Sequence, residues 1–276
     1  MELTYKQCTF ETDEELQQLV DLQNEVYEAR GLRFTKEEFI HWYVDNPVGK
    51  VISFNAFDGD RMVAHQSFVP CLLKAKDRII KCACSISVVT HPGYQGHGIF
   101  SKLTNLGVDY AREQGYEMLI AVPNGNSYPA FVKHAGFTFV TRLDVKIGFG
   151  VGVKSKDECT YFNYWTKETL QWRLGIGEYY LKRNLIVGKF KPFVNSFMGC
   201  VSDDLKSQID IKKKGCPFGA QIYVGWGAKL NGVFVKVPKF IKHSPFNFVY
   251  KDLTGGQLPP ITKENLFFQL IDFDVA

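Results

Sequence analysis

The most informative segment of the chain runs Val88-Val89-Thr90-His91-Pro92-Gly93-Tyr94-Gln95-Gly96-His97-Gly98-Ile99-Phe100-Ser101-Lys102-Leu103. It begins inside a long apolar run, residues 79–90, which predicts a buried strand. A glycine-rich loop follows at residues 91–98. Residues 99–114 then show the apolar spacing of an amphipathic helix, which Gly115 ends. The segment therefore predicts a strand, a loop and a helix in direct succession.

Two glycines of this loop, Gly96 and Gly98, allow the backbone to approach a ligand closely and to turn several N–H groups toward it. The helix start that follows adds a partial positive charge, so the segment suits an anion such as a pyrophosphate. Neither the GxxxxGK[ST] nor the GxGxxG phosphate-binding pattern is present. Gly-x-Gly alone is also typical of a simple tight turn, and both interpretations remain open at this point.

The residues before the loop predict two helices and an antiparallel meander. Thr12 and Thr35 each open a Thr-x-x-Glu capping box, and Asn46-Pro47-Val48-Gly49 ends the second helix. Asp58-Gly59-Asp60 is a tight hairpin signal between the first two strands. The expected strands lie at residues 51–57, 62–73 and 79–90.

After the loop and its helix, the pattern predicts a short strand at 117–122, a short helix capped by Asn126 or Ser127, and a strand from Phe137 to about Gly148. Residues 148–158 are the best candidate for a domain boundary. The second half then predicts a helix at 166–174 and strands within 178–200, 220–250 and 264–275. Thr35–Gly49 and Thr166–Tyr180 share a Thr-capped helix with an inner Trp, which indicates either a duplicated fold or a chance similarity.

Length and composition narrow the class of protein. The chain has 276 residues, 45% apolar and 22% charged, as expected for a globular protein of one large or two small domains. No apolar run is long enough to span a bilayer, and no secretory signal opens the chain, so we expect a cytoplasmic protein. Its seven cysteines include no CxxC pair, so we expect buried thiols rather than disulfides or a metal site.

The charge is unevenly distributed. Residues 1–150 carry 15 Lys and Arg against 18 Asp and Glu, a net charge of −3, and residues 151–276 carry 18 against 11, a net charge of +7. The second half either meets an anion such as a nucleotide or simply has a solvated basic surface. No basic stripe or nucleic-acid-binding motif is present, so we do not expect binding to nucleic acid.

Residues 88–103 resemble the acetyl-CoA-binding motif of the GCN5-related N-acetyltransferases (GNAT), in which Q/R-x-x-G-x-G/A follows a strand. Gln95, Gly96 and Gly98 match, whereas Phe100 departs from the usual Gly or Ala. Asn124–Phe137 resembles the second motif of the family, and the resemblance covers residues 3–148. It implies a mixed α/β fold with a GNAT domain at 1–148 and a degenerate, GNAT-like domain at 149–276 that contributes to the acceptor site.

The resemblance also implies a site for acetyl-CoA, with no metal. The pantetheine arm would pair with backbone groups near Val88 and Val89 and contact Asn126, unless Asn126 only caps its helix. The pyrophosphate would sit on the N–H groups of Gln95, Gly96, His97, Gly98, Ile99, Phe100 and Ser101.

Several residues are candidates for proton transfer. The family's usual acidic Tyr would fall at Val132, which cannot serve, so Tyr128, one turn earlier, is the substitute. His65 and Ser87 are candidate bases, and Asp272 and Asp274 could reach the same cleft. The alternative for His65 is a buried structural role. Trp42, Tyr43, Trp172 and Trp226 would line the acceptor site, unless they are core residues.

We therefore expect an N-acetyltransferase that transfers acetyl from acetyl-CoA to a primary amine by direct attack. A subset of the family with a second, transferase-like half contains members that act on sugar amines, which favours an amino sugar on a nucleotide carrier. The alternatives are a protein or antibiotic amine as acceptor, and a non-catalytic acyl-CoA-binding protein.

Overall fold

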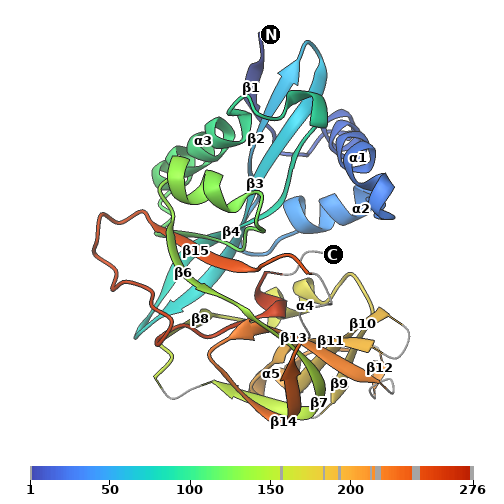
Figure 1. Ribbon diagram of the computed structural model, residues 1–276, viewed down its shortest axis with the longest axis vertical. Helices are drawn as coiled ribbons and strands as arrows, with labels where there is room; N and C mark the ends of the chain where they lie inside the picture. Colours follow the sequence, from blue (N-terminus) through green and yellow to red (C-terminus); the bar gives the residue numbers. More distant parts are fainter. Residues whose placement is uncertain are drawn as a thin grey trace.

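Two mixed β-sheets form the framework of the computed structural model, one in the upper and one in the lower part of Figure 1. The structure describes residues 2–155, 158–182, 184–191, 194–211, 213–214, 219–237 and 243–273. Within these residues, no helix combines the length and the apolar character needed to cross a membrane. The fold is mixed α/β, as the sequence predicted.

The first sheet has the strand order β1-β2-β3-β4-β5-β15-β6, with β8 added beside β3. All neighbours are antiparallel except β4 and β5, which run parallel. The strands are β1 (Thr4–Gln7), β2 (Ile52–Asp58), β3 (Arg61–Ala75), β4 (Arg78–Thr90), β5 (Met118–Ala121), β6 (Thr138–Arg142), β8 (Tyr161–Asn163) and β15 (Asn247–Asp252).

The second sheet has the order β12-β9-β10-β11-β13-β7-β14, and β16 pairs with β13. Here β11 and β13 are parallel neighbours, as are β12 and β9. The strands are β7 (Asp144–Ser155), β9 (Tyr179–Lys182), β10 (Leu185–Lys191), β11 (Val194–Cys200), β12 (Lys213–Lys214), β13 (Ala220–Trp226), β14 (Ala228–Lys236) and β16 (Phe268–Gln269).

Helices cover both faces of the first sheet. On one face, α1 (Asp13–Tyr27) and the α2 segment (Lys36–Phe39), which continues as η2 (Ile40–Val44), pack on β3 and β4. On the other face, α3 (Ile99–Glu113) packs on β2 and β3. The remaining helical segments are η1 (Glu28–Arg30), η3 (Pro92–Tyr94), η4 (Ala130–His134), α4 (Lys167–Arg173), α5 (Asp203–Gln208) and η5 (Leu270–Asp272).

The second half repeats the element order of the first. The series α2-β2-β3-β4-α3-β5 recurs as α4-β9-β10-β11-α5-β13, with the same strand directions in each sheet. Thr35 and Thr166 each form a capping box at the start of the corresponding helix. Trp42 and Trp172, which follow these caps, touch each other with ring centroids 5.1 Å apart. This repeated order supports the duplication that the two Thr-Trp segments indicated.

The penultimate strand of each sheet connects the two halves. β15, from the end of the second half, lies between β5 and β6, and β7, which spans residue 148, lies between β13 and β14. Strand pairing thus crosses the predicted boundary in both directions, and the division into residues 1–148 and 149–276 stays a prediction. The predicted linker at 148–158 begins inside β7, and residues 156–157 lie outside the described residues.

Three local predictions were wrong. The strand expected from Phe137 to Gly148 breaks at Leu143, because β6 and β7 belong to different sheets. The strand expected at 264–275 is limited to β16, which turns directly into η5; Asp274 lies outside the described residues. The cap near residue 126 is Asn124, whose Oδ1 accepts from the backbone N–H groups of Asn126 and Ser127. Among the described cysteines, Cys8, Cys82 and Cys84 are buried, as expected, whereas Cys71, Cys159 and Cys200 are half-buried.

Candidate functional site

The parallel strands β4 and β5 separate beside the glycine-rich loop. Cys82–Ser85 pairs with Met118–Ala121, and β5 then ends while β4 continues to Thr90. From Ser85 to Val88, β4 changes from buried to half-buried. Because β5 no longer covers this edge, the end of β4 offers backbone groups to a ligand lying between the strands.

A β-bulge marks the same part of β4. Ser67 faces Ile86 and His65 faces Val89, so Ser87 and Val88 together face one residue of β3. Ser87 has φ +53°, a left-handed conformation that is costly for a residue with a Cβ.

Helix α1 holds this bulge in place. Gln23 Nε2 donates to the Ser87 carbonyl at 2.9 Å, and the Tyr27 hydroxyl donates to the Val88 carbonyl at 3.2 Å. The Val88 carbonyl predicted to bind pantetheine therefore already accepts one hydrogen bond from the protein.

The loop itself leaves open space in front of the start of α3. Gly96 and Gly98 have φ +81° and +71°, and a Cβ built at either position meets no atom within 4 Å. Gly98 caps α3 without a side-chain bond, and Lys102 N–H makes the first turn's bond to the Gly98 carbonyl at 3.1 Å. The N–H groups of residues 99–101 consequently have no acceptor within the helix, as an anion site requires.

The side chains of this segment have different environments. Ile99 is buried, whereas Phe100 is half-buried with its ring edge-to-face against Phe131, at 5.2 Å between centroids. Gln95 Nε2 donates to the Thr90 carbonyl at 3.0 Å, and His97 is exposed. The predicted contacts of this loop are therefore available mainly through its backbone.

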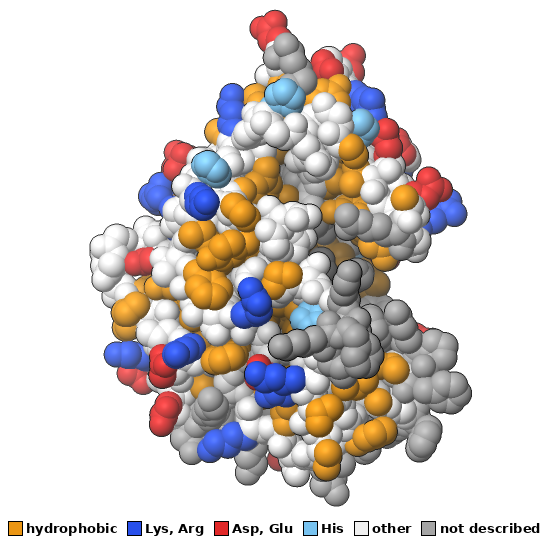
Figure 2. Space-filling model, viewed as in Figure 1, with side chains coloured by type: hydrophobic (Ala, Val, Ile, Leu, Met, Phe, Trp, Pro, Cys, Tyr) orange, Lys and Arg blue, Asp and Glu red, His pale blue; other side chains and the backbone are white. Residues whose placement is uncertain are grey.

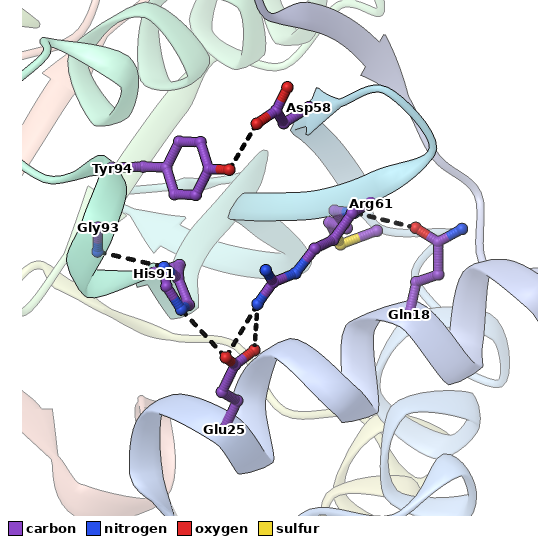
Figure 3. Close-up of polar contacts among 8 residues, drawn as sticks. Gln18, Glu25, Asp58, Arg61, His91, Gly93 and Tyr94 are labelled. Carbon is purple, nitrogen blue, oxygen red and sulfur yellow. Dashed lines mark hydrogen bonds and ion pairs between the residues drawn. The ribbon is translucent and has the colours of Figure 1, made fainter. Parts of the chain in front are cut away.

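Polar contacts connect the first residues of the loop, His91 to Gly93, to helix α1 (Figure 3). Glu25 accepts hydrogen bonds from Arg61 at 2.7 and 2.9 Å and lies 3.1 Å from His91 Nε2. Because His91 Nδ1 accepts from the Gly93 N–H at 3.2 Å, Nε2 carries the proton and donates to Glu25. Arg61 lowers the pKa of the Glu25 carboxyl, which favours its charged form. These hydrogen bonds hold the turn at His91 to Gly93, from which the glycine-rich loop begins.

The second motif lies at the end of β5. Tyr128 is half-buried, with its ring edge-to-face against Phe139 at 5.7 Å. Asn126 is exposed and lines a surface hollow with Asn124 and Ser244. Because Asn124 Oδ1 is the capping acceptor, the Asn126 side chain is available for other contacts.

His65 lies in a buried polar network. Its Nε2 is 3.0 Å from the Tyr43 hydroxyl, and its Nδ1 is 2.7 Å from Asn55 Oδ1. Since Asn55 Oδ1 only accepts, Nδ1 carries the proton and Nε2 accepts from Tyr43. Ser53 lies 3.3 Å from the same Nδ1, and Ser67 lies 3.1 Å from the Tyr43 hydroxyl. His65 and Tyr43 have no exposed surface.

Burial sets the protonation of this network. It lowers the pKa of His65 to about 3 and raises the pKa of Tyr43 to about 12, so both side chains are neutral near pH 7. Ser67 Oγ donates to the Ile86 carbonyl at 2.6 Å, which connects the network to the open end of β4. Both ring nitrogens of His65 are already bonded, so contact with a substrate would require rearrangement. Base roles for His65 and Ser87 stay predictions.

On the same face of the first sheet, a partly open cavity lies between residues of the two halves. Cys84 and Ile86 of β4 form one wall, next to the open strand end, and Arg173 of α4 and Asp272 of η5 form another. The sequence candidates Trp42 and Trp172 line it, whereas Tyr43 belongs to the polar network and Trp226 packs elsewhere.

A comparison with family models matched residues 10–140 to the acetyltransferase (GNAT) domain. The chain contains a GNAT acetyltransferase domain. The matched domain is that of an acyltransferase enzyme, as the motifs at 88–103 and 124–137 predicted. No curated protein matches the sequence.

Two solved structures extend the similarity of fold to the second half. A GCN5-related N-acetyltransferase from Kribbella flavida is 12% identical, with a TM-score of 0.58. A conserved protein of unknown function from Enterococcus faecalis, described as a probable N-acyltransferase, is 11% identical, with a TM-score of 0.57. Each match covers 92% of this chain and 73% of the other. At these identities the likeness concerns the fold.

Sequence reasoning missed two residues of the cavity. Asn163 and Trp165 line it, although neither belongs to a family motif quoted above. Their common signal is proximity to the Thr166 cap, which repeats the position of the Thr35 cap in the first half. Residues of the GNAT domain therefore meet residues of the second half at this cavity.

Proposed function

We propose that the protein is an acetyl-CoA-dependent N-acetyltransferase whose donor lies between the ends of β4 and β5. The observation that carries the proposal is the strand separation after Ser85, next to the open, uncapped start of α3. A thioester donor needs an extended slot for its arm and a set of N–H groups for its pyrophosphate, and these two features are adjacent here.

In this proposal, backbone N–H groups of Gln95–Ser101 bind the pyrophosphate. The arm lies beside Ser85–Val89, near Gln66 of β3. Gln66 is buried; its Nε2 donates to Ser85 Oγ at 2.8 Å, and its Oε1 has no hydrogen-bond partner among the described residues. A buried acceptor without a donor is costly, so an amide N–H of the arm would satisfy it.

The reaction needs little from the protein beyond orientation. The acceptor nitrogen attacks the thioester carbon, the C–S bond breaks, and the sulfur leaves as the thiol. Tyr128 is our candidate to protonate the sulfur, with Asn126 as a second contact to the donor. His65 and Ser87 support the bulge through the Tyr43 network in this proposal, rather than contacting the amine.

For the acceptor we propose an amino sugar. The indole rings of Trp42 and Trp172 line the cavity, where they would contact the apolar face of a sugar ring, and Ile86, next to the proposed thioester position, lines it as well. A nucleotide carrier has less support. On the face in Figure 2, the drawn Lys and Arg side chains are spread over the upper and lower parts of the molecule. The described cavity lining has one cation, Arg173, which donates to the Ile271 carbonyl and stacks on Trp42.

The experiment is a calorimetric titration of acetyl-CoA into the wild type and two matched variants. Gly98→Trp inserts a large side chain at the proposed pyrophosphate position. Gly115→Trp makes the same change at the other end of α3, where φ is +73° and the surroundings are equally open, so it controls for backbone strain. We expect wild-type binding near −8 kcal/mol, that is a Kd of about 1 μM.

The expected pattern is binding by the wild type and Gly115→Trp, with loss in Gly98→Trp. If the wild type binds neither acetyl-CoA nor a longer acyl-CoA, the proposal fails. Binding without release of free thiol, across a panel of amines, would favour a non-catalytic acyl-CoA-binding protein.

A further inference from the structure

The cavity between the halves combines an aromatic lining with two buried polar acceptors. Three of the four tryptophans of the chain, Trp42, Trp165 and Trp172, line it. Most of the remaining lining is apolar, and six of these residues come from β3 and β4 of the first sheet. Such a lining suits a small ring without charge, because burying an unpaired charge there would be costly.

Asp272 is the first polar acceptor. It is 7% exposed, and its Oδ2 accepts from the Gln269 N–H at 2.6 Å while its Oδ1 accepts from Trp165 Nε1 at 3.2 Å. These bonds fix the carboxylate in place. Because an ionised carboxylate has about four acceptor positions, it can accept further hydrogen bonds.

Asn163 is the second polar acceptor. It is 8% exposed and lines the cavity; its Nδ2 donates to the Asp272 backbone carbonyl at 3.4 Å. Its Oδ1 is buried and has no hydrogen-bond partner among the described residues. A ligand that brings N–H donors to this corner would satisfy the amide oxygen and the carboxylate together, and an amine brings two or three.

We propose that this cavity binds the acceptor as a primary amine on an uncharged, ring-sized body, and that Asp272 takes the proton from its nitrogen. The inference rests on the proposed acetyl transfer and adds the acceptor site and the base. Ile86 and Cys84 of β4 form the wall of the cavity next to the open strand end, so an amine held by Asp272 lies on the side from which the thioester would be reached.

The step is balanced without a further reactant. The nitrogen forms a bond to the carbonyl carbon, the C–S bond breaks with its electron pair going to sulfur, one N–H proton goes to Asp272, and the sulfur takes a proton. Asp272 then returns its proton to solvent. The carboxylate comes from the second half, whereas the donor site belongs to the first.

The environment of Asp272 suits this role. Burial raises the pKa of its carboxyl to about 7, although hydrogen bonds from Gln269 and Trp165 and the charge of Arg173 oppose the rise. The other titratable groups that interact with it are the neutral side chains of Cys71, Cys84 and Tyr223. A base whose pKa lies near neutral pH can accept a proton and release it again.

The test uses the tryptophan fluorescence of the full-length protein, since three of the four indoles line the cavity. The probe is cyclohexylamine, with cyclohexanol as the matched ligand that has no amine. We expect a saturable change with cyclohexylamine and at least about tenfold weaker binding of cyclohexanol.

Asp272→Asn should weaken cyclohexylamine binding by about tenfold or more. Glu264→Gln, which changes an exposed carboxylate, should bind like the wild type. Asn163→Leu removes the second acceptor and gives an independent arm should Asp272→Asn fail to fold. Equal binding of amine and alcohol, or unchanged binding in folded Asp272→Asn and Asn163→Leu, would overturn the proposal.

Turnover separates this inference from the proposed function. With D-glucosamine as acceptor and thiol release from acetyl-CoA as readout, Asp272→Asn should lose at least about 100-fold in kcat. Its affinity for acetyl-CoA should not change. The rise of wild-type kcat/KM near pH 7 should be absent from the variant. Acetyl-CoA binding with equal turnover in both proteins would reject Asp272 and leave the transferase intact, whereas absence of acetyl-CoA binding would reject the transferase itself.

Discussion

The neutral, buried His65 should make the protein sensitive to mild acid, and the effect can be calculated. Its pKa is about 3 in the folded protein and 6.5 when exposed. The unfolded chain therefore binds a proton at His65 below pH 6.5 that the folded protein does not bind, so stability is lost as pH falls through this range. Between pH 7.5 and pH 5 the loss is about 2 kcal/mol. This value depends on the unfolded pKa, because the folded histidine stays neutral at both pH values.

The assay is urea unfolding of the wild type and His65→Gln at both pH values. Gln offers an acceptor to the Tyr43 hydroxyl but does not titrate, so the variant keeps the pH dependence of every other group. It should be less stable at pH 7.5, because the contact with Asn55 is altered. The stability difference between the two proteins should shrink by about 2 kcal/mol at pH 5. If both proteins lose the same stability between the two pH values, the reasoning about His65 is refuted.

Two further predictions concern the framework of the donor site. A Cβ at Gly107 of α3 would lie 2.7 Å from Phe68, a fully buried side chain of β3. Gly107→Ala should therefore lower the urea midpoint, because overpacking costs about 1–3 kcal/mol, more than the roughly 1 kcal/mol that Ala gains over Gly in a helix; an unchanged midpoint would contradict this packing. A fragment of residues 1–148 lacks β15, whose Phe248 and Val249 are fully buried. It should show no cooperative thermal transition by circular dichroism, and a cooperative transition would instead support the predicted boundary.

Local sequence patterns predicted most elements because their determinants are local. The Thr35 capping box, the Thr166 cap, the hairpin at 58–60 and the apolar period of residues 99–113 act within a few residues, and each element formed where expected. The turn at the loop glycines could also be predicted from local sequence, because glycine readily adopts the positive φ found at Gly96 and Gly98.

The failures involve contacts between distant segments. The run 137–148 has an uninterrupted strand composition, and only the pairing of Val145 with Val224 and of Thr141 with Phe248 shows that it belongs to two sheets. Likewise, Asn163 and Asp272 are 109 residues apart, and no local period brings them together. Asp272 was a candidate because of its alternation with Asp274, although the strand behind that argument is mostly absent.

The insertion of β15 into the first sheet explains why the candidate sites meet at β4. β15 lies against β5 and so completes the sheet beside the proposed donor slot, although it comes from the far end of the chain. The same segment of chain continues to β16 and η5, which carries Asp272 into the cavity on the other side of β4. A second half that only docked on the first would allow this carboxylate to move relative to Ile86. A second half joined through an inner strand of the first sheet restrains that movement, because β15 is hydrogen-bonded to neighbours on both sides. The fold therefore supplies the precise orientation that a direct transfer between two bound substrates requires.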